Sequence, residues 1–199
     1  MRHVTRSWFL LWCSFALALA GCGSGSQSTT FRSTDVTGAE FGKDFQLSDF
    51  NGQQRTLADY RGKVLVVFFG YTHCPDVCPT TLTELANAIK KLGADGDKVQ
   101  VALITADPER DTEAVLKQYL TAFNPGFIGL RGTPEQTEKV AKDFEVLIQK
   151  NPGSDAANYT VDHSSGTYIY DPSGRLRLYV SYGQGADVFA HDIGKLLKS

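Results

Sequence analysis

The feature that most constrains this chain is a strongly apolar run followed by two cysteines four positions apart. Residues 64–69 are valine, leucine and phenylalanine, a composition that predicts a buried strand. Gly70 interrupts the run, and a loop with Cys74 follows it. Cys78 precedes Pro79, which suits the first turn of a helix because the missing N–H of proline is no loss there. The cysteines therefore lie where a strand passes into a helix N-terminus, whose N–H groups and dipole favour thiolate over thiol.

Length and composition indicate a single globular domain. The chain has 199 residues, of which 42% are hydrophobic and 21% charged, and this is enough for one substantial core. Its formal net charge is −2. A nucleic-acid partner is not expected, because such partners favour a basic surface.

The first 21 residues have the pattern of a targeting segment. Two arginines open it, and residues 8–20 form an apolar run shorter than the roughly 20 residues that span a bilayer. Residues 19–22 are Leu-Ala-Gly-Cys, which resembles a bacterial lipobox. We therefore expect a lipoprotein signal peptide at residues 1–21 and a lipid on Cys22. The alternatives are an ordinary secretory signal cut near Ala20, or an uncleaved anchor.

The segment after the expected lipid site predicts a flexible connection to the domain. Residues 23–33 are rich in glycine, serine, threonine and glutamine, a composition typical of flexible linkers. We expect a tether at residues 22–40 and a globular domain at residues 41–199. The lipid would anchor this domain to a membrane outside the cytoplasm, on the periplasmic face or the outer surface of a bacterium.

The four cysteines of the chain then divide into two groups. Cys13 lies in the expected signal peptide, and Cys22 is expected to carry lipid. Cys74 and Cys78 remain as thiols in an oxidising compartment, where they can pair with each other or share a metal ion. A structural disulfide, or two cysteines that merely fill the core, is the alternative.

The predicted elements favour an α/β fold. Residues 41–57 predict a hairpin through Asn-Gly at residues 51–52, a pair that favours a type I′ turn. Residues 64–69, 80–92 and 99–105 then predict strand, helix and strand, so the two strands should be parallel with a right-handed crossover.

Further elements complete a central mixed sheet with helices on both faces. A capping box predicts a helix that begins after Thr133 and contains Gln136 in its first turn. The periodicity predicts the remaining elements as follows: a short strand at residues 127–130, an edge strand at residues 146–149, a polar loop at residues 150–160, a hairpin of residues 167–170 with residues 175–180, and a C-terminal helix.

Residues 107–112, Asp-Pro-Glu-Arg-Asp-Thr, follow the second strand of the βαβ unit. Their carboxylates are compatible with acid–base chemistry. A turn followed by a helix N-cap is the commoner explanation, with Asp111 or a neighbour capping a helix at residues 112–123.

Two cysteines and one distant histidine suggest a soft-metal site, because thiolates suit Cu(I) and imidazole suits either oxidation state of copper. His163 lies where a polar loop meets a strand, and Asp162 or a backbone carbonyl is expected to orient its ring. His73 adjoins Cys74, but neighbouring side chains usually diverge, and His191 is expected on the surface of the last helix. From the residues alone, His163 remains an ambiguous single histidine.

Three motifs, taken in order, resemble the Sco/SenC family of copper-binding assembly proteins. They are Tyr-Thr-His-Cys-Pro-Asp-Val-Cys-Pro at residues 71–79, the segment at residues 107–112, and Asp-His-Ser-Ser at residues 162–165. The resemblance extends from about residue 41 to the C-terminus. Family members commonly have a membrane-spanning anchor, where this chain has a lipobox-like segment.

The resemblance implies a thioredoxin-like fold with an N-terminal β-hairpin. It maps Cys74, Cys78 and His163 onto the copper ligands, with Cu(I), Cu(II) or both as the bound ion. The implied role is delivery of copper to, or thiol maintenance of, the copper A centre in cytochrome c oxidase subunit II.

Two classes of function remain open at this point. One is a copper chaperone, for which two thiolates and a histidine form an incomplete shell that a partner can empty. The other is a thiol–disulfide oxidoreductase that uses Cys74 and Cys78 as a redox pair, although thioredoxins space their cysteines by two residues rather than three. A third interpretation is a peroxiredoxin-like peroxidase, because residues 78–82 loosely resemble the nucleophile loop of that family.

Overall fold

The structure is a computed structural model that describes residues 30–153 and 158–199. The expected signal peptide and Cys22, with its expected lipid, lie outside the described residues. Within the described ranges, no helix is both long enough and apolar enough to cross a membrane.

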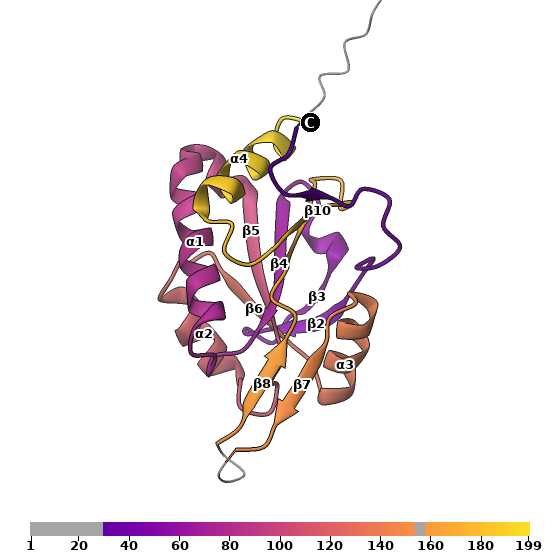
Figure 1. The fold of residues 1–199 in the computed structure, drawn as a ribbon, viewed down its shortest axis with the longest axis vertical. Coiled ribbons are helices and arrows are strands. Elements are labelled where there is room, and N and C mark those ends of the chain that lie inside the picture. Colours follow the sequence, from indigo (N-terminus) through magenta and orange to yellow (C-terminus); the bar gives the residue numbers. More distant parts are fainter. Residues whose placement is uncertain (1–29, 154–157) are drawn as a thin grey trace, which may run out of the picture.

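A mixed β-sheet occupies the centre of the domain (Figure 1). In the described part of the chain it has eight strands, in the order β1-β10-β9-β4-β5-β6-β2-β3. Neighbours β4, β5 and β6 run parallel, and the other neighbouring pairs are antiparallel. The strands are β1 (Thr34–Asp35), β2 (Gln46–Asp49), β3 (Gln54–Thr56), β4 (Val64–Gly70), β5 (Val99–Thr105), β6 (Ile128–Arg131), β9 (Thr167–Tyr170) and β10 (Leu176–Val180).

The helices begin close to where the sequence predicts them. They are α1 (Val77–Leu92), α2 (Glu113–Thr121), α3 (Pro134–Asp143) and α4 (Ala186–Leu196), with short 3-10 helices at η1 (Leu57–Tyr60) and η2 (Gly93–Lys98). The capping box of α3 is confirmed, since Thr133 and Gln136 exchange hydrogen bonds. The cap of α2 is Thr112, whose hydroxyl accepts from the N–H of Val115. The expected cap is therefore the neighbour of Asp111 and not Asp111 itself, and the helix begins one residue later than predicted.

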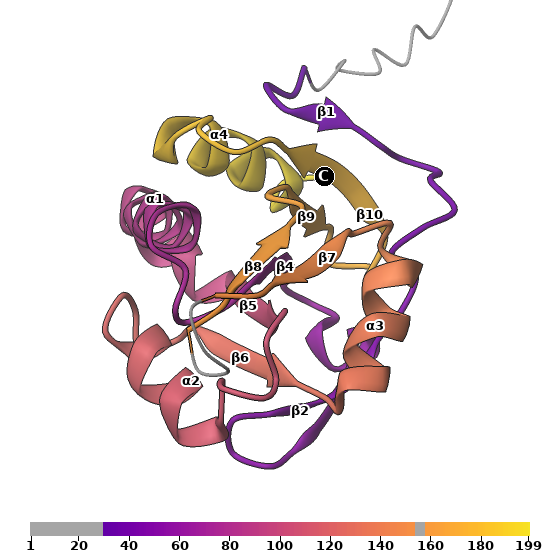
Figure 2. The same ribbon diagram turned by 60° about the horizontal axis from the view of Figure 1, so that its bottom comes forward.

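Two hydrophobic cores cover the two faces of the sheet. Alternate residues of β4 point to opposite faces, because side chains alternate along a strand. Val64, Val66 and Phe68 pack in the core with α1, α2 and α4, while the intervening Leu65 and Val67 pack in the core with α3. The views in Figures 1 and 2 show α3 on the opposite side of the sheet from α1. This confirms the predicted arrangement of helices on both faces.

The N-terminal hairpin is present, but its turn differs from the predicted one. Strands β2 and β3 pair antiparallel, and the N–H of Gly52 donates to the carbonyl of Asp49 over 2.9 Å. Gly52 has φ 78°, whereas Asn51 is not among the described residues with positive φ. A type I′ turn needs positive φ at both central residues, so the predicted turn type is wrong. The carboxylate of Asp49 accepts from the N–H of Asn51 and Gln53 and thereby stabilises a longer loop.

Residues before the hairpin also pack on the domain. Strand β1 pairs with β10, and the backbone N–H groups of Arg32 and Ser33 donate to the buried carboxylate of Asp192 in α4. These residues had the composition of a tether. Their contacts with β10 and α4 place them against the folded domain.

A second, two-stranded sheet projects at one end of the molecule (Figure 1). It consists of β7 (Ile148–Asn151) and β8 (Thr160–His163), which pair antiparallel with Ile148 opposite His163. The sequence predicted β7 two residues too early at each end, and it assigned Thr160 to a loop. Strand β8 contains one buried apolar side chain, Val161. One such residue does not give the alternating hydrophobic pattern by which a strand is predicted from sequence.

Candidate metal centre

The candidate metal centre lies at the carboxyl end of the parallel strands β4 and β5. Both strands end at the same edge of the sheet, where Gly70 is paired with Thr105. The loop after β4 contains Cys74, and the second residue of α1 is Cys78. The last residue of β8 is His163, which reaches the same place from the separate two-stranded sheet.

The structure brings the three predicted ligands together. The Sγ atoms of Cys74 and Cys78 and a ring nitrogen of His163 all lie within 4.8 Å of one another. Both cysteines are free thiols, Cys78 buried and Cys74 partly exposed. His73 is not part of the group: its side chain is exposed, and its Nδ1 lies 3.1 Å from the hydroxyl of Thr72.

Gly70 leaves the space that the buried sulfur occupies. A Cβ atom at this position would lie 2.8 Å from the Sγ of Cys78 and 3.3 Å from a methyl of Leu103. A side chain at position 70 would therefore clash with Cys78 of α1. Glycine ends the apolar run because β4 and this cysteine pack closely together. Sequence reasoning treated Gly70 only as the end of the strand.

The two thiols have different pKa values, and Cys78 is the one that keeps its proton. A hydrogen bond from Cys78, supported by the backbone N–H groups of Asp76 and Cys78, lowers the pKa of Cys74 to about 5. The hydrogen bond that Cys78 gives to Cys74, together with burial, raises the pKa of the Cys78 thiol. At neutral pH the pair therefore holds one thiolate, on the more exposed sulfur, as expected for a cysteine at a helix N-terminus.

The ring of His163 is oriented by a backbone carbonyl. Its Nδ1 lies 3.1 Å from the carbonyl oxygen of Ser164, which can only accept, so this nitrogen carries the hydrogen. Its Nε2 is then free to accept and lies 3.5 Å from the Sγ of Cys78. Asp162 is exposed, on the opposite face of β8 from His163, because side chains alternate along a strand. Of the two groups expected to orient the ring, the structure has the backbone carbonyl, that of Ser164, and not the carboxylate of Asp162.

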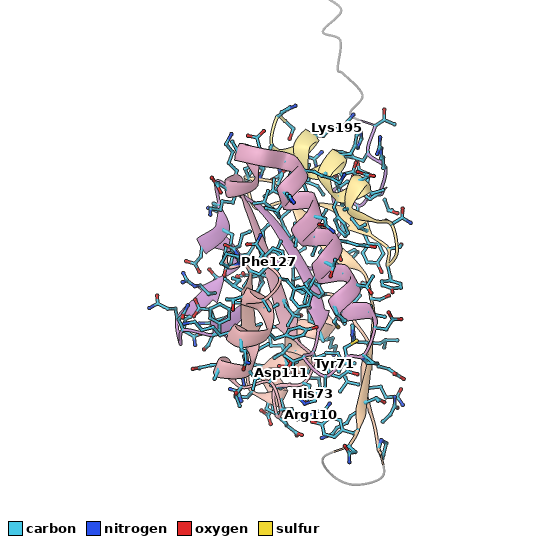
Figure 3. All side chains as sticks on the ribbon, turned by 90° about the vertical axis from the view of Figure 1, so that its left-hand side faces the viewer. Tyr71, His73, Arg110, Asp111, Phe127 and Lys195 are labelled. Atoms are coloured by element: carbon cyan, nitrogen blue, oxygen red, sulfur yellow. The ribbon has the colours of Figure 1, made fainter. Side chains whose placement is uncertain are left out.

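Asp111 supports the cysteine loop, the segment between β4 and α1 that contains Cys74. It is completely buried and accepts hydrogen bonds from the hydroxyls of Thr72 and Thr105, both over 2.6 Å, and from the N–H of Thr72. Burial raises the pKa of its carboxyl group, and these donors offset part of that rise. Figure 3 shows Asp111 beside Tyr71 and His73, at the end of the molecule that holds the site. The sequence signalled an acidic motif here, but it could not show that Asp111 faces a loop 39 residues earlier.

The donor set fits copper by its chemistry. Two thiolate sulfurs are soft ligands that favour Cu(I), and imidazole accepts either oxidation state. A closed structural zinc site has four protein ligands, whereas this group offers three. A three-ligand group with one partly exposed sulfur leaves room for an incoming ligand from another molecule.

Comparisons with known proteins agree with this site and fold. The family model described as SCO1/SenC matches residues 33–198. The SCO2 homologue of mouse mitochondria is 38% identical over 152 residues, and the aligned part covers 75% of this chain and 60% of that protein. The chain thus spans less than two thirds of the length of this relative.

Solved structures show the same architecture. Bradyrhizobium japonicum ScoI, determined with copper bound, is 41% identical with a TM-score of 0.71, and the match covers 80% of this chain and 100% of that one. Apo Sco1 from Thermus thermophilus is 37% identical with a TM-score of 0.76, and the match covers 86% of this chain and 99% of that one. The predicted thioredoxin-like fold is confirmed by these neighbours. From the family model and these relatives together, the chain belongs to the SCO1/SenC family.

Proposed function

We propose that this protein is a copper chaperone that binds one copper ion through Cys74, Cys78 and His163. The observation that carries the proposal is the convergence of two sulfurs and a correctly oriented imidazole within 4.8 Å, at the open end of the sheet. One cysteine is already a thiolate at neutral pH, so copper binding needs to release only one further proton from the pair.

The incomplete ligand shell supports delivery rather than permanent storage. Three protein ligands leave a position for a ligand of the acceptor, so the ion can pass between proteins by exchange of one bond at a time. The partly exposed Cys74 is the ligand that an acceptor meets first, whereas Cys78 is buried. Cu(I), which prefers thiolates, is the cargo that this site favours most, and the imidazole also allows Cu(II).

The acceptor we propose is the copper A centre in cytochrome c oxidase subunit II. The Sco family is one of cytochrome c oxidase assembly proteins, and this supports an acceptor in that enzyme. Thiol maintenance of the same centre is the alternative role at the same partner.

We further propose that residues 1–21 are a lipoprotein signal, that Cys22 carries the lipid, and that the residues between Cys22 and β1 connect it to the domain, which includes β1 rather than beginning at residue 41. The lipobox-like Leu-Ala-Gly-Cys and the polar composition after it support this organisation. It would place the copper site outside the cytoplasm, near a membrane-bound acceptor.

A thiol–disulfide oxidoreductase is the second candidate, and the asymmetry of the two cysteines favours it. The Cys74 thiolate would attack a partner disulfide, forming a mixed disulfide and releasing one partner thiol. Cys78 would then attack the Cys74 sulfur, which releases the second partner thiol and leaves a Cys74–Cys78 disulfide. This chemistry uses no histidine.

Replacement of His163 by alanine separates the two functions. We expect wild-type protein, reduced and without oxygen, to bind one equivalent of copper, in separate titrations with Cu(I) and with Cu(II). We expect His163→Ala to bind copper at least about 100-fold more weakly, a larger loss than the 10–100-fold typical of outer-shell changes. Competition with a chromophoric Cu(I) chelator measures the affinity, and reduction of a model disulfide measures redox activity.

The control is His191→Ala, which removes a histidine from α4. Its copper affinity should equal that of wild type. Unchanged copper binding in His163→Ala, with disulfide reduction lost in Cys74→Ser, would reject the chaperone and favour the oxidoreductase.

A further inference from the structure

The segment after β5 contacts both halves of the metal centre. On one side, Asp111 binds Thr72 in the cysteine loop. On the other side, its neighbour Arg110 contacts Tyr159, which immediately precedes β8, the strand that ends at His163. One turn of chain thus touches the cysteine side and the histidine side of the site. Figure 3 shows Arg110 and Asp111 close to Tyr71 and His73 at this end of the molecule.

Arg110 and Tyr159 make two direct contacts and are also joined through Asp107. The guanidinium carbon of Arg110 lies 3.5 Å from the centroid of the Tyr159 ring, and its Nη1 donates to the Tyr159 carbonyl over 3.0 Å. The hydroxyl of Tyr159 donates to Asp107 over 2.7 Å, and Asp107 also forms an ion pair with Arg110. The ammonium of Lys150, from β7, lies 3.8 Å from the same ring centroid, so the ring is held by cations from two segments.

The contacts continue from Tyr159 to the histidine. Tyr159 and Val161 are buried, whereas Thr160 and Asp162 are exposed, so alternate residues face inward as far as His163. The N–H of Val161 donates to the hydroxyl of Tyr71 over 3.3 Å. The ring of Tyr71 in turn meets the His163 ring edge to face, with centroids 6.0 Å apart.

The histidine needs such a brace because its support is separate from that of the cysteines. Cys78 belongs to α1, which packs on the eight-stranded sheet, while His163 belongs to the two-stranded sheet of β7 and β8. Within the described residues, the packing of β8 next to the site rests on a small cluster around Tyr71, Tyr159 and Val161.

We propose that the stack of Arg110 on Tyr159 is a latch that positions His163 and sets how readily the imidazole leaves bound copper. The proposal rests on the proposed copper-binding function. During delivery a Cu–N bond to His163 breaks and a bond to an acceptor ligand forms, with no change in the oxidation state of copper. When β8 is held firmly, the imidazole of His163 rebinds the ion after it dissociates. When β8 is loosened, a ligand of the acceptor binds the ion instead of the imidazole. Arg110 and Tyr159 are thus positioning residues that touch no copper ligand atom themselves.

The first test is the rate at which Cu(I)-loaded protein gives copper to bathocuproine disulfonate without oxygen. We expect Tyr159→Leu to release copper about 10-fold faster than wild type, at the lower end of the range for residues that support a metal ligand. Tyr159→Phe keeps the ring and the stack, so it should remain within about 3-fold of wild type. The matched control is Lys117→Met, which removes a cation 5.8 Å from the ring centroid of Phe50 and should leave the rate unchanged.

The same substitution in a His163→Ala background shows whether the latch acts through the histidine. If it does, Tyr159→Leu has no further effect once the imidazole is gone. An equal acceleration in both backgrounds would overturn the proposal, because the effect would then pass through the cysteines or the whole fold. A wild-type rate for Tyr159→Leu would overturn it as well.

A measurement on the metal-free protein keeps the latch testable apart from copper delivery. The ¹⁵N–¹H spectrum of the His163 ring should show a single tautomer with the hydrogen on Nδ1, as its bond to Ser164 requires. In Tyr159→Leu we expect the ring signals to average between tautomers, and in Tyr159→Phe to resemble wild type. Unchanged ring signals in Tyr159→Leu would contradict the latch. Failure of copper to bind the wild type, by contrast, would contradict only the proposed function.

Discussion

Asp111→Ala is expected to lower the free energy of unfolding by about 3 kcal/mol, the largest stability effect that we predict for a single residue near the site. The carboxylate is fully buried and accepts from the N–H and hydroxyl of Thr72 and from the hydroxyl of Thr105. Its removal leaves these donors without an acceptor, and each unsatisfied buried polar group costs about 1–3 kcal/mol, less where a hydroxyl can rotate to another partner.

Urea unfolding of the reduced, metal-free protein at neutral pH measures this effect. Asp95→Ala is the control, because Asp95 forms an exposed ion pair with Lys98 and should contribute less than about 1 kcal/mol. Asp111→Asn should fall between the two, since an amide oxygen still accepts but the amide N–H groups gain no matching acceptor. Equal stability of Asp111→Ala and Asp95→Ala would show that this carboxylate does not hold the cysteine loop.

The two cysteines of the metal-free protein are expected to differ by at least about 100-fold in their rate of reaction with iodoacetamide at neutral pH. Cys74 is partly exposed, and hydrogen bonds lower its pKa to about 5, so it is a thiolate at this pH. Cys78 is 1% exposed, and the pKa of its thiol is raised, so it stays protonated and shielded.

The pH dependence of the alkylation rate tests whether Cys74 is the thiolate. A lowered pKa means that Cys74 is already ionised above about pH 6, so its alkylation rate should be nearly constant from there to pH 8. An ordinary cysteine with a pKa near 8.5 would accelerate by more than 10-fold over the same interval.

Mass spectrometry of single variants assigns the reacting sulfur. Cys78→Ser keeps a hydroxyl that can donate to Cys74, so this variant should still react quickly, whereas Cys74→Ser should react slowly. Fast alkylation of Cys74→Ser, or a steep rise in the wild-type rate between pH 6 and 8, would contradict the assignment of the thiolate to Cys74.

Local patterns in the sequence predicted most elements of this fold. The apolar run of β4, the helical spacing of α1 and the capping box at Thr133 and Gln136 each involve residues close together in the chain. Such local signals reflect burial and backbone hydrogen bonding within one element. The prediction of a type I′ turn at Asn51 and Gly52 was wrong, because the carboxylate of Asp49 accepts hydrogen bonds from the N–H groups of Asn51 and Gln53 and stabilises a different turn.

The contacts that support the metal centre could not be predicted from such local patterns. Arg110 meets Tyr159 across 49 residues, and Asp111 meets Thr72 across 39 residues. No periodicity connects such positions. The motif at residues 107–112 predicted a helix cap, which Thr112 provides, but it did not predict that Asp111 and Arg110 contact the two sides of the metal centre. The two cysteines were evident from their spacing alone, whereas His163 was singled out by resemblance to a family.

Copper K-edge X-ray absorption of the Cu(I)-loaded protein tests the central claim most directly, because it counts the ligand atoms. For the wild type we predict two sulfur neighbours and one imidazole nitrogen, from Cys74, Cys78 and His163. For His163→Ala we predict that the imidazole contribution disappears while both sulfurs remain. A shell of sulfur alone in the wild type, or an imidazole signal that persists in His163→Ala, would contradict the three-ligand site.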